Sequence, residues 1–409
     1  MSFLERHRFL LAFALLSTLM GTSVGIAKVA TSLYALDLHA GETALGLIAA
    51  SQVVGALLVS VPVGVLVDRY GPARPFLIGT LVAGTAYVVL PLVPSIWFLL
   101  ICTTVISCFM PMRFVSLSTV FMRELEHIGV GKAGWYRGTH MVGMMLLGPA
   151  ISVAATQAVG FVGTYWLIAG LFALTIVVSP IVFGRYGAGV AADAATRARS
   201  PRTLSRAELR AQLSLIVREP ALRRTCIVEL AAQSVNGFFA FFIIIIAVRT
   251  LSLGEGRATQ FVSLEGAAYM IALLFFGTLV ARLGDERVYR GSFALATIAL
   301  LTLATGSTPL VLSIGSVLLG LGLGTLQIVN LTRFAYLGAR LGRGKVAGLT
   351  PLMGTAGSLL GSLLGGMLGQ VIGLQRVFFL YAASFALLAL LARAVKVAPV
   401  TAVEQVSNA

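Results

Sequence analysis

Twelve long apolar runs are the feature of this chain that most restricts its fold. Each is close to the length of about 20 apolar residues that a helix needs to cross the hydrocarbon core of a bilayer. The first six cover approximately residues 9–35, 43–66, 76–93, 97–122, 138–159 and 161–183. The second six cover approximately residues 225–248, 259–280, 291–307, 309–336, 348–373 and 377–392. The pattern predicts an all-α membrane protein with 12 transmembrane helices.

The charge content supports this fold class. Only 11% of the 409 residues are charged, whereas soluble domains carry about 25%. The net charge of +15 does not indicate nucleic-acid binding, because the basic residues lie at the ends of apolar runs. The basic N-terminus resembles a signal peptide. Its apolar stretch, however, is longer than that of a signal, and no polar segment follows a cleavage site, so we expect a retained first span.

Lysine and arginine are unequally distributed between the two sides of the membrane. With both termini on one side, the 30 basic residues divide into 24 on that side, 3 in the opposite loops and 3 within spans. Cytoplasmic loops carry the excess of Lys and Arg. We therefore expect both termini in the cytoplasm and a multi-pass protein of the plasma membrane, which is the inner membrane in a bacterium.

A single long polar segment, residues 184–224, separates the sixth run from the seventh. It divides the chain into an N-terminal six-helix bundle, residues 1–183, and a C-terminal six-helix bundle with a short tail, residues 225–409. Within the segment, Ser205 and Glu208 form a capping box that precedes apolar residues at helical spacing. We expect a short amphipathic helix that lies on the inner leaflet and tethers the linker.

The two halves share a charged loop motif. "GVLVDRYGPAR" begins at Gly64, and a similar "GTLVARLGDER" begins at Gly277, 213 residues later. The same offset places Gly148 on Gly361. One constant offset indicates two six-helix repeats in parallel orientation. Parallel repeats are a recurring plan of secondary transporters, which hold their solute near the middle of the membrane.

The first motif resembles the loop signature of the major facilitator superfamily, G-x-x-x-D-R-x-G-[RK]-[RK], and lies between spans two and three as in that family. Pro72 and Ala73 depart from the pattern, because the family often has two basic residues there. The chain length, the apolar runs and the long central segment extend the resemblance to the whole chain. The resemblance implies two six-helix bundles related by a pseudo-twofold axis.

The motif is also expected to form a conformational latch, a contact that holds the cytoplasmic side closed. Gly64 would let a neighbouring helix come close, and Gly71 would support a tight turn. Asp68 can cap a helix N-terminus, which the family analogy places at the start of span eleven near Gly348. A loop that only fixes the topology is the alternative. The residues of the expected latch are Gly64, Asp68, Arg69, Gly71, Arg74 and Arg123.

Polar side chains inside the apolar runs are functional candidates, because such groups are costly in lipid. The candidates for substrate binding are Lys28, Arg113, Gln233, Asn236, Gln327 and Asn330. The candidates for proton coupling are Glu265 and Glu229, although the position of Glu229 near the end of its span is equally consistent with an interfacial role. Arg333 lies near the inner end of span ten, where we expect it to snorkel.

Two stripes of small residues follow helix faces. In span one, Gly21 and Gly25 share a face with Ser17, Lys28 and Ser32, and we interpret this face as a wall of the central cavity. Small residues in line also let helices pack closely, and a sliding interface between the halves is a second interpretation for span eleven. The glycines of span eleven are Gly357, Gly361, Gly365, Gly369 and Gly373.

The sequence therefore predicts a secondary transporter that moves a small organic solute by alternating access. A proton gradient is the expected driver, because the chain has no G-x-x-x-x-G-K-[ST] loop for ATP. Gly148–Pro149 faintly resembles a motif of family exporters and slightly favours export of drug-like or metabolite molecules. Lys28 and Arg113 leave uptake of an organic anion, such as a carboxylate, as the alternative.

Other functional classes have less support in the sequence. H-E-x-x-H and G-x-S-x-G are absent, and the His and Cys residues have no ligand spacing, so we expect no enzyme, no metal and no cofactor. A receptor or scaffold that does not transport stays open, although it would have little use for buried charges. The expected partners are a small-molecule substrate, H+ and the lipid bilayer, without nucleic acid, and we expect a monomer.

Overall fold

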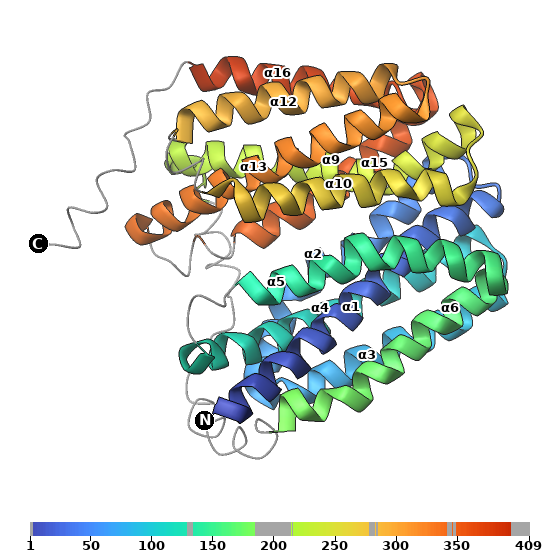
Figure 1. The fold of residues 1–409 in the computed structure, drawn as a ribbon, viewed down its shortest axis with the longest axis vertical. Coiled ribbons are helices and arrows are strands. Elements are labelled where there is room, and N and C mark those ends of the chain that lie inside the picture. The colour runs from blue at the N-terminus through green and yellow to red at the C-terminus, as the bar shows by residue number, and fades with distance from the viewer. Residues whose placement is uncertain are drawn as a thin grey trace, which may run out of the picture. The chain divides into compact units, whose positions relative to one another are not determined.

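The computed structural model describes residues 3–128, 134–184, 214, 216–277, 283, 285–341, 346 and 349–393, and every regular element within these ranges is a helix (Figure 1). Contacts divide the chain into two compact units, Met1–Leu209 and Arg210–Ala409, called here the N-terminal and C-terminal units. The all-α fold class is thus confirmed. The amphipathic helix expected around Ser205 and Glu208 lies outside the described residues.

The N-terminal unit consists of long helices that follow the apolar runs. They are α1 (Phe3–Asp37), α2 (Glu42–Tyr70), α3 (Ala73–Val89), η1 (Leu90–Leu92), α4 (Ile96–Ile128), α5 (Gly134–Met141), η3 (Val142–Leu147) and α6 (Gly148–Phe183). The element η1 is a 3-10 turn that extends α3, and η3 is a π-helical segment that joins α5 to α6. Pro149 follows η3 and has no N–H to donate to the preceding turn, which favours the wider π-helical pattern there.

The C-terminal unit repeats this arrangement. Its helices are α9 (Pro220–Leu251), α10 (Glu255–Phe275), α12 (Asp285–Thr305), α13 (Pro309–Leu341), α15 (Leu349–Ile372) and α16 (Val377–Arg393). Ten helices in the described part of the chain are long and apolar enough to cross a membrane. One of them, Gly138–Phe183, contains the predicted spans 138–159 and 161–183, and a shorter apolar helix, Val377–Leu390, coincides with the last predicted run.

A glycine turn shows that the repeat extends to the backbone. Gly160 interrupts α6 between the predicted spans five and six, with φ 68° and ψ −175°. Gly373, which lies 213 residues later between α15 and α16, also has a positive φ, 88°. L side chains rarely adopt this conformation, so glycine makes the same turn in both halves.

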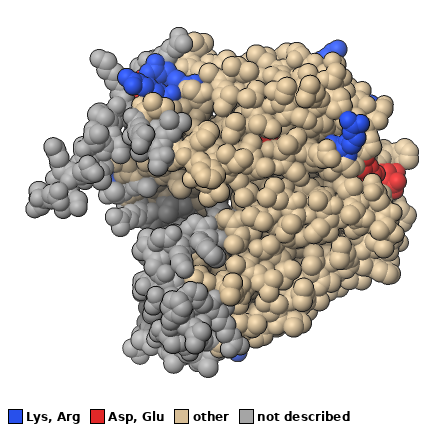
Figure 2. Space-filling model, viewed as in Figure 1, with Lys and Arg blue, Asp and Glu red and all other residues tan. Residues whose placement is uncertain are grey.

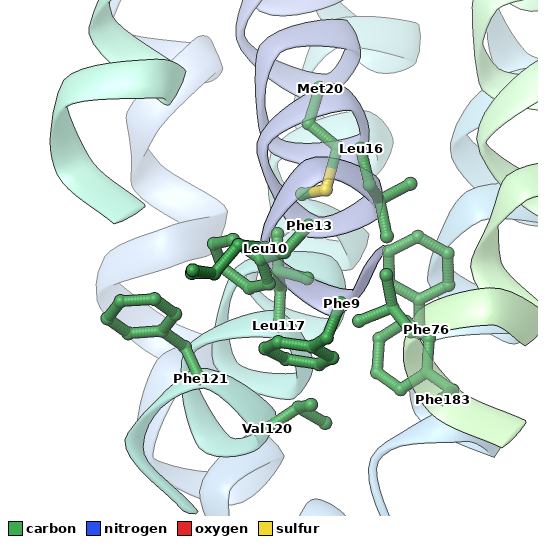
Figure 3. Close-up of a cluster of buried hydrophobic side chains, with 11 residues drawn as sticks. Phe9, Leu10, Phe13, Leu16, Met20, Phe76, Leu117, Val120, Phe121 and Phe183 are labelled. Carbon is green, nitrogen blue, oxygen red and sulfur yellow. The ribbon is translucent and has the colours of Figure 1, made fainter. Parts of the chain in front are cut away.

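The N-terminal unit has an apolar core at one end of α1 (Figure 3). Phe13 of α1 contacts Phe121 of α4 with ring centroids 4.7 Å apart, and Phe76 of α3 contacts Phe183 of α6 at 4.8 Å. Burial of these side chains joins four helices. We call this set the N-terminal apolar cluster, and its members are Phe9, Leu10, Phe13, Leu16, Met20, Phe76, Leu117, Val120, Phe121, Val182 and Phe183.

The outer surface is apolar as well. Figure 2 shows a face with few Lys, Arg, Asp or Glu side chains among the described residues. Large apolar side chains such as Trp97, Val177 and Val371 are more than two-thirds exposed. Because a soluble protein rarely leaves apolar patches of this extent in water, the surface fits a lipid surrounding.

Glycines bring α1 and α6 into backbone contact. A Cβ atom on Gly148 would lie 2.5 Å from Cα of Gly25, and one on Gly21 would overlap the carbonyl group of His140. Gly21 and Gly25 therefore pack against α5, η3 and α6. The interpretation of this face as a cavity wall is wrong for the two glycines, because close packing produces the same stripe of small residues.

The glycine stripe of α15 has a similar role in the C-terminal unit. A Cβ atom on Gly357 would lie 3.0 Å from Cβ of Gln233, and one on Gly361 would lie 3.0 Å from Cα of Ser234. Both neighbours belong to α9. The stripe thus permits close packing inside the unit, and the interpretation as a sliding interface between the halves is not needed to explain it.

Candidate functional site

The C-terminal unit contains a buried network of polar side chains. Its members lie on three helices, α9, α12 and α13, and are held in place by the apolar residues around them. We call them the C-terminal polar network, which consists of Glu229, Gln233, Tyr289, Gln327, Asn330 and Arg333. Its centre is the carboxylate of Glu229, which is only 2% exposed.

Two amide groups donate hydrogen bonds to the Glu229 carboxylate. Nε2 of Gln233, one turn further along α9, lies 3.1 Å from Oε1, and Nδ2 of Asn330 on α13 lies 2.9 Å from Oε2. Both carboxylate oxygens therefore act as acceptors. Among the described residues, no Lys or Arg forms an ion pair with this carboxylate, so amides alone replace the water that it loses on burial.

The network continues from Asn330 towards α12. The hydroxyl group of Tyr289 donates to Oδ1 of Asn330, and the guanidinium group of Arg333 lies 4.2 Å from the centroid of the Tyr289 ring. A cation over an aromatic face is attracted by the ring quadrupole. Arg333, which was expected only to snorkel, is thus linked to Glu229 through Tyr289 and Asn330.

A second branch runs from Gln233 to Gln327. Nε2 of Gln233 also donates to Oε1 of Gln327, at 3.3 Å. Gln327 is 4% exposed, and its own Nε2 is buried without a hydrogen-bond partner in the described part of the protein. A buried unsatisfied donor costs about 1–3 kcal/mol. The amide of Gln327 therefore offers a donor that a ligand could satisfy.

The matching positions of the N-terminal unit are apolar. The repeat offset of 213 places the six network residues on Leu16, Met20, Phe76, Phe114, Leu117 and Val120. Five of these belong to the N-terminal apolar cluster, and Phe114 packs against it (Figure 3). The same kind of bundle is therefore built without polar groups at these places. Because buried polar groups are costly, the network is better explained by function than by folding.

This comparison predicts how the network responds to substitution. We expect Glu229→Leu to lower the free energy of unfolding by about 2–4 kcal/mol, because the amides of Gln233 and Asn330 lose their acceptor. The triple variant Glu229→Leu, Asn330→Leu, Tyr289→Phe installs the residues of the N-terminal cluster and should recover at least half of that loss. Thermal unfolding in detergent measures both. A triple variant less stable than the single one would contradict the comparison.

The structure brings together four predicted candidates, Glu229, Gln233, Gln327 and Asn330. Asn236 lies one turn further along α9, is half-buried, and forms no hydrogen bond with the network among the described residues. Glu265 is 3% exposed on α10, where its backbone carbonyl group faces Gly320 of α13, and it is not hydrogen-bonded to the network in the described part of the chain. Tyr289 was not predicted as a candidate. The repeat offset pairs it with Phe76, so a comparison of the two halves could have shown that its hydroxyl group is a polar addition.

The two basic candidates of the N-terminal unit lie in different surroundings. Lys28 is exposed on α1. Arg113 of α4 is fully buried, its guanidinium group lies 3.7 Å from the centroid of the Phe172 ring, and its Nη2 donates to Oγ1 of Thr175 at 3.2 Å. The side chain thus lies between helices of its own unit, with Phe76 on a third side. These contacts describe a packed cation.

The repeat offers a substitute for Arg113. The matching residue in the C-terminal unit is Leu326, which is also fully buried. We expect Arg113→Leu to retain nearly the wild-type melting temperature, because an apolar side chain of similar volume can fill the site. Arg113→Ala should lower the free energy of unfolding by about 2–4 kcal/mol through the cavity it leaves. Thermal unfolding tests this pair, and equal losses in both variants would show that the charge itself is needed.

The loop motif between α2 and α3 is only partly described. Gly71 has φ 78° and ψ 162°, which fits the expected tight turn. Gly64 lies within α2, and a Cβ atom there would have open space within its own unit, so the close helix approach expected at Gly64 stays a prediction. The side chains of Asp68 and Arg123 and the residue Gly348 lie outside the described residues. The latch therefore stays a prediction.

A search of the described residues finds no group of three His, Cys, Asp or Glu side chains that could hold a metal ion. The chemistry available in the C-terminal polar network is that of hydrogen bonding and proton binding: one carboxylate, three amides, one phenol and one guanidinium group. Such groups bind and orient a solute.

Comparison with known proteins agrees with the fold. The structure of the nucleoside transporter NupG has a TM-score of 0.76 and 13% identity, with 94% of this chain and 98% of that chain covered. A bacterial homologue of the human lysosomal transporter Spinster, in an inward-facing and unoccupied conformation, has a TM-score of 0.74 and 13% identity, with 96% and 98% covered. At this identity the likeness concerns the fold alone. No curated protein sequence matches the chain.

The family assignment comes from the sequence itself. The family model of the Major Facilitator Superfamily matches residues 11–262 and 225–408, so both halves of the chain are covered. This match agrees with the loop motif, with the repeat and with the helical fold. The chain belongs to the major facilitator superfamily.

Proposed function

We propose that this protein exchanges a small organic solute for protons across the plasma membrane. As a member of the major facilitator superfamily, the chain is a multi-pass membrane transporter. The observation that supports proton exchange is the buried carboxylate of Glu229, to which two amides donate. The matching residue of the N-terminal unit is the apolar Leu16. A carboxylate that has no ion-pair partner among the described residues is a suitable proton carrier.

The transport cycle follows from the two-part architecture. The bundles 1–183 and 225–409, joined by the linker 184–224, pivot so that the solute site opens to one side of the membrane at a time. The latch around Asp68 and Arg123 holds the cytoplasmic side closed during part of the cycle. Both termini lie in the cytoplasm, and the protein works as a monomer.

The solute is recognised through the amide side chains of the C-terminal unit. Gln233, Gln327 and Asn330 belong to the polar network, and Asn236 lies beside it on α9. Amides select hydrogen-bonding groups without requiring a charge on the solute. This set fits a polar metabolite or drug-like molecule, which exchange against inward-moving protons would export. Uptake of an organic anion is the second candidate and depends on Lys28, since Arg113 is enclosed by its own unit.

A flux screen in proteoliposomes tests the proposal. The panel contains organic acids, cationic drugs and nucleosides, the last because of the likeness to a nucleoside transporter. We expect an imposed pH gradient to drive at least one polar solute against its own gradient, in the wild type and in Lys28→Ala. Loss of organic-acid flux alone in Lys28→Ala would favour anion uptake. No flux of any compound would favour the receptor or scaffold class.

A further inference from the structure

We propose that protonation of Glu229 reverses the hydrogen bonds of the Gln233–Gln327 amide pair, and that this reversal changes the group offered to the solute from a donor to an acceptor. The inference rests on the proposed transport function and describes how its proton and solute sites communicate. It concerns the C-terminal unit alone, because the matching positions of the N-terminal unit are Leu16, Met20 and Phe114.

The structure determines which carboxylate oxygen can receive the proton. Tyr289 donates to Oδ1 of Asn330, so the Asn330 amide presents its Nδ2 to Oε2 of Glu229, 2.9 Å away. An oxygen that faces an N–H group must accept. The proton therefore binds Oε1, which faces Gln233. Gln233 is half-buried and is free of such a constraint, because its other amide atom can turn towards water.

Protonation of Oε1 converts an acceptor into a donor. The new O–H group of Glu229 then points at Nε2 of Gln233, which is also a donor, so the Gln233 amide rotates and presents its Oε1. In the structure, Oε1 of Gln327 lies 3.3 Å from Nε2 of Gln233 and accepts from it. After the Gln233 amide has rotated, two oxygens face each other there. The Gln327 amide therefore rotates as well and donates its Nε2 to Oε1 of Gln233. The step adds one proton and forms one O–H bond, on Glu229. The amide rotations break no covalent bond.

The rotation changes the end of the chain of hydrogen bonds. In the structure, Nε2 of Gln327 is a buried donor without a hydrogen-bond partner in the described residues, so the unprotonated state offers an N–H group to a solute. After protonation the same place is occupied by the Gln327 carbonyl oxygen. A solute acceptor, such as a carbonyl or ether oxygen, therefore binds when Glu229 is ionised and is released when it is protonated. This competition is the requirement for exchange of solute against proton.

Other ionisable groups surround Glu229 without hydrogen-bonding to it in the described part of the chain. They contribute a field, but the two amides alone contact the carboxylate. The helix α15, which packs against α9, has no ionisable side chain. The ionisable residues on the helices around Glu229 are Arg223, Arg224, Cys226 and Arg249 on α9, Glu255, Arg257, Glu265 and Tyr269 on α10, Asp285, Glu286, Arg287, Tyr289 and Arg290 on α12, Arg333, Tyr336 and Arg340 on α13, and Tyr381 and Arg393 on α16.

Infrared difference spectroscopy of the purified protein, recorded between alkaline and acidic pH without any solute, tests the inference. We expect a C=O stretching band of a protonated carboxyl group that is lost in Glu229→Gln and kept in Glu265→Gln. In Gln233→Leu the band should persist but move to higher frequency, because its O–H group loses the amide acceptor. Gln327→Leu should move the band less, since Gln327 does not touch Glu229.

Each result decides one point. A band that survives Glu229→Gln overturns the assignment of the proton to Glu229, and an unshifted band in Gln233→Leu overturns the amide reversal. The variant Gln233→Met gives a second comparison if Gln233→Leu does not fold, and its band should also lie at a higher frequency than in the wild type. Because the spectra need no transport, a negative flux screen with a positive band would reject the transport function and leave the proton site intact.

Discussion

Proteoliposomes that contain Glu229→Gln no longer use a pH gradient to drive solute, and we expect the gradient-driven initial rate to fall at least about tenfold, or ~1.4 kcal/mol in the coupled step. The glutamine amide has the shape of the carboxyl group but cannot bind and release a proton. Solute movement down its own concentration gradient should continue. The rate of solute accumulation with and without an imposed pH gradient measures the effect.

The protein should remain folded in this variant. A glutamine at position 229 can accept from Asn330 with its oxygen and donate to Gln233 with its nitrogen, once the Gln233 amide has rotated, so no buried polar atom loses its partner. The control is Glu286→Gln on α12, a partly exposed residue that forms an ion pair of 3.4 Å with Arg290. Full coupling in Glu229→Gln would overturn the assignment to Glu229, and a loss of coupling in Glu265→Gln in addition would move the proton site to Glu265.

The fold was predictable because lipid imposes a length on each helix. The run predicted at 377–392 corresponds to α16, Val377–Arg393, and the repeat offset found in the loop motif reappears in the glycine turns at Gly160 and Gly373. The ends were harder to predict. Helix α4 continues to Ile128, beyond the apolar limit near residue 122, because a helix can extend into the polar region without lipid contact.

The candidate site was predictable in its members but not in its connections. Glu229, Gln233, Gln327 and Asn330 were conspicuous as polar residues in apolar runs, yet only the packing of α9 against α13 shows that they meet. Sequence could not show which way Arg113 points, because a single charge in a mostly apolar helix can face either a cavity or the neighbouring helices of its own unit. Tyr289 lies near the start of its span, where an aromatic residue is also typical of the membrane interface.

We expect Gly148→Val to lower the free energy of unfolding by at least about 3–5 kcal/mol. A Cβ atom at this position would lie 2.5 Å from Cα of Gly25, 2.8 Å from its carbonyl carbon and 2.9 Å from the backbone nitrogen of Ile26. All three are backbone atoms of α1, so no rotamer change can relieve the overlap, and α1 and α6 must separate. Monodisperse yield in detergent and the melting temperature measure the loss.

Gly170→Val is the matched control, because Gly170 lies on the same helix and a Cβ atom there would meet no atom within 4 Å. We expect its yield and melting temperature to stay near those of the wild type, and Gly148→Ala to fall between the two valine variants. The comparison also tests whether the Gly148–Pro149 pair, which resembles an exporter motif, is needed for packing or for transport. If Gly148→Val fails to fold and Gly170→Val folds normally, contact with Gly25 explains why residue 148 is a glycine. The argument for export then depends on proton exchange at Glu229 and no longer on the Gly148–Pro149 pair. If Gly148→Val unfolds like the wild type and only its transport changes, the pair acts in the transport cycle and the close contact of α1 with α6 is not essential.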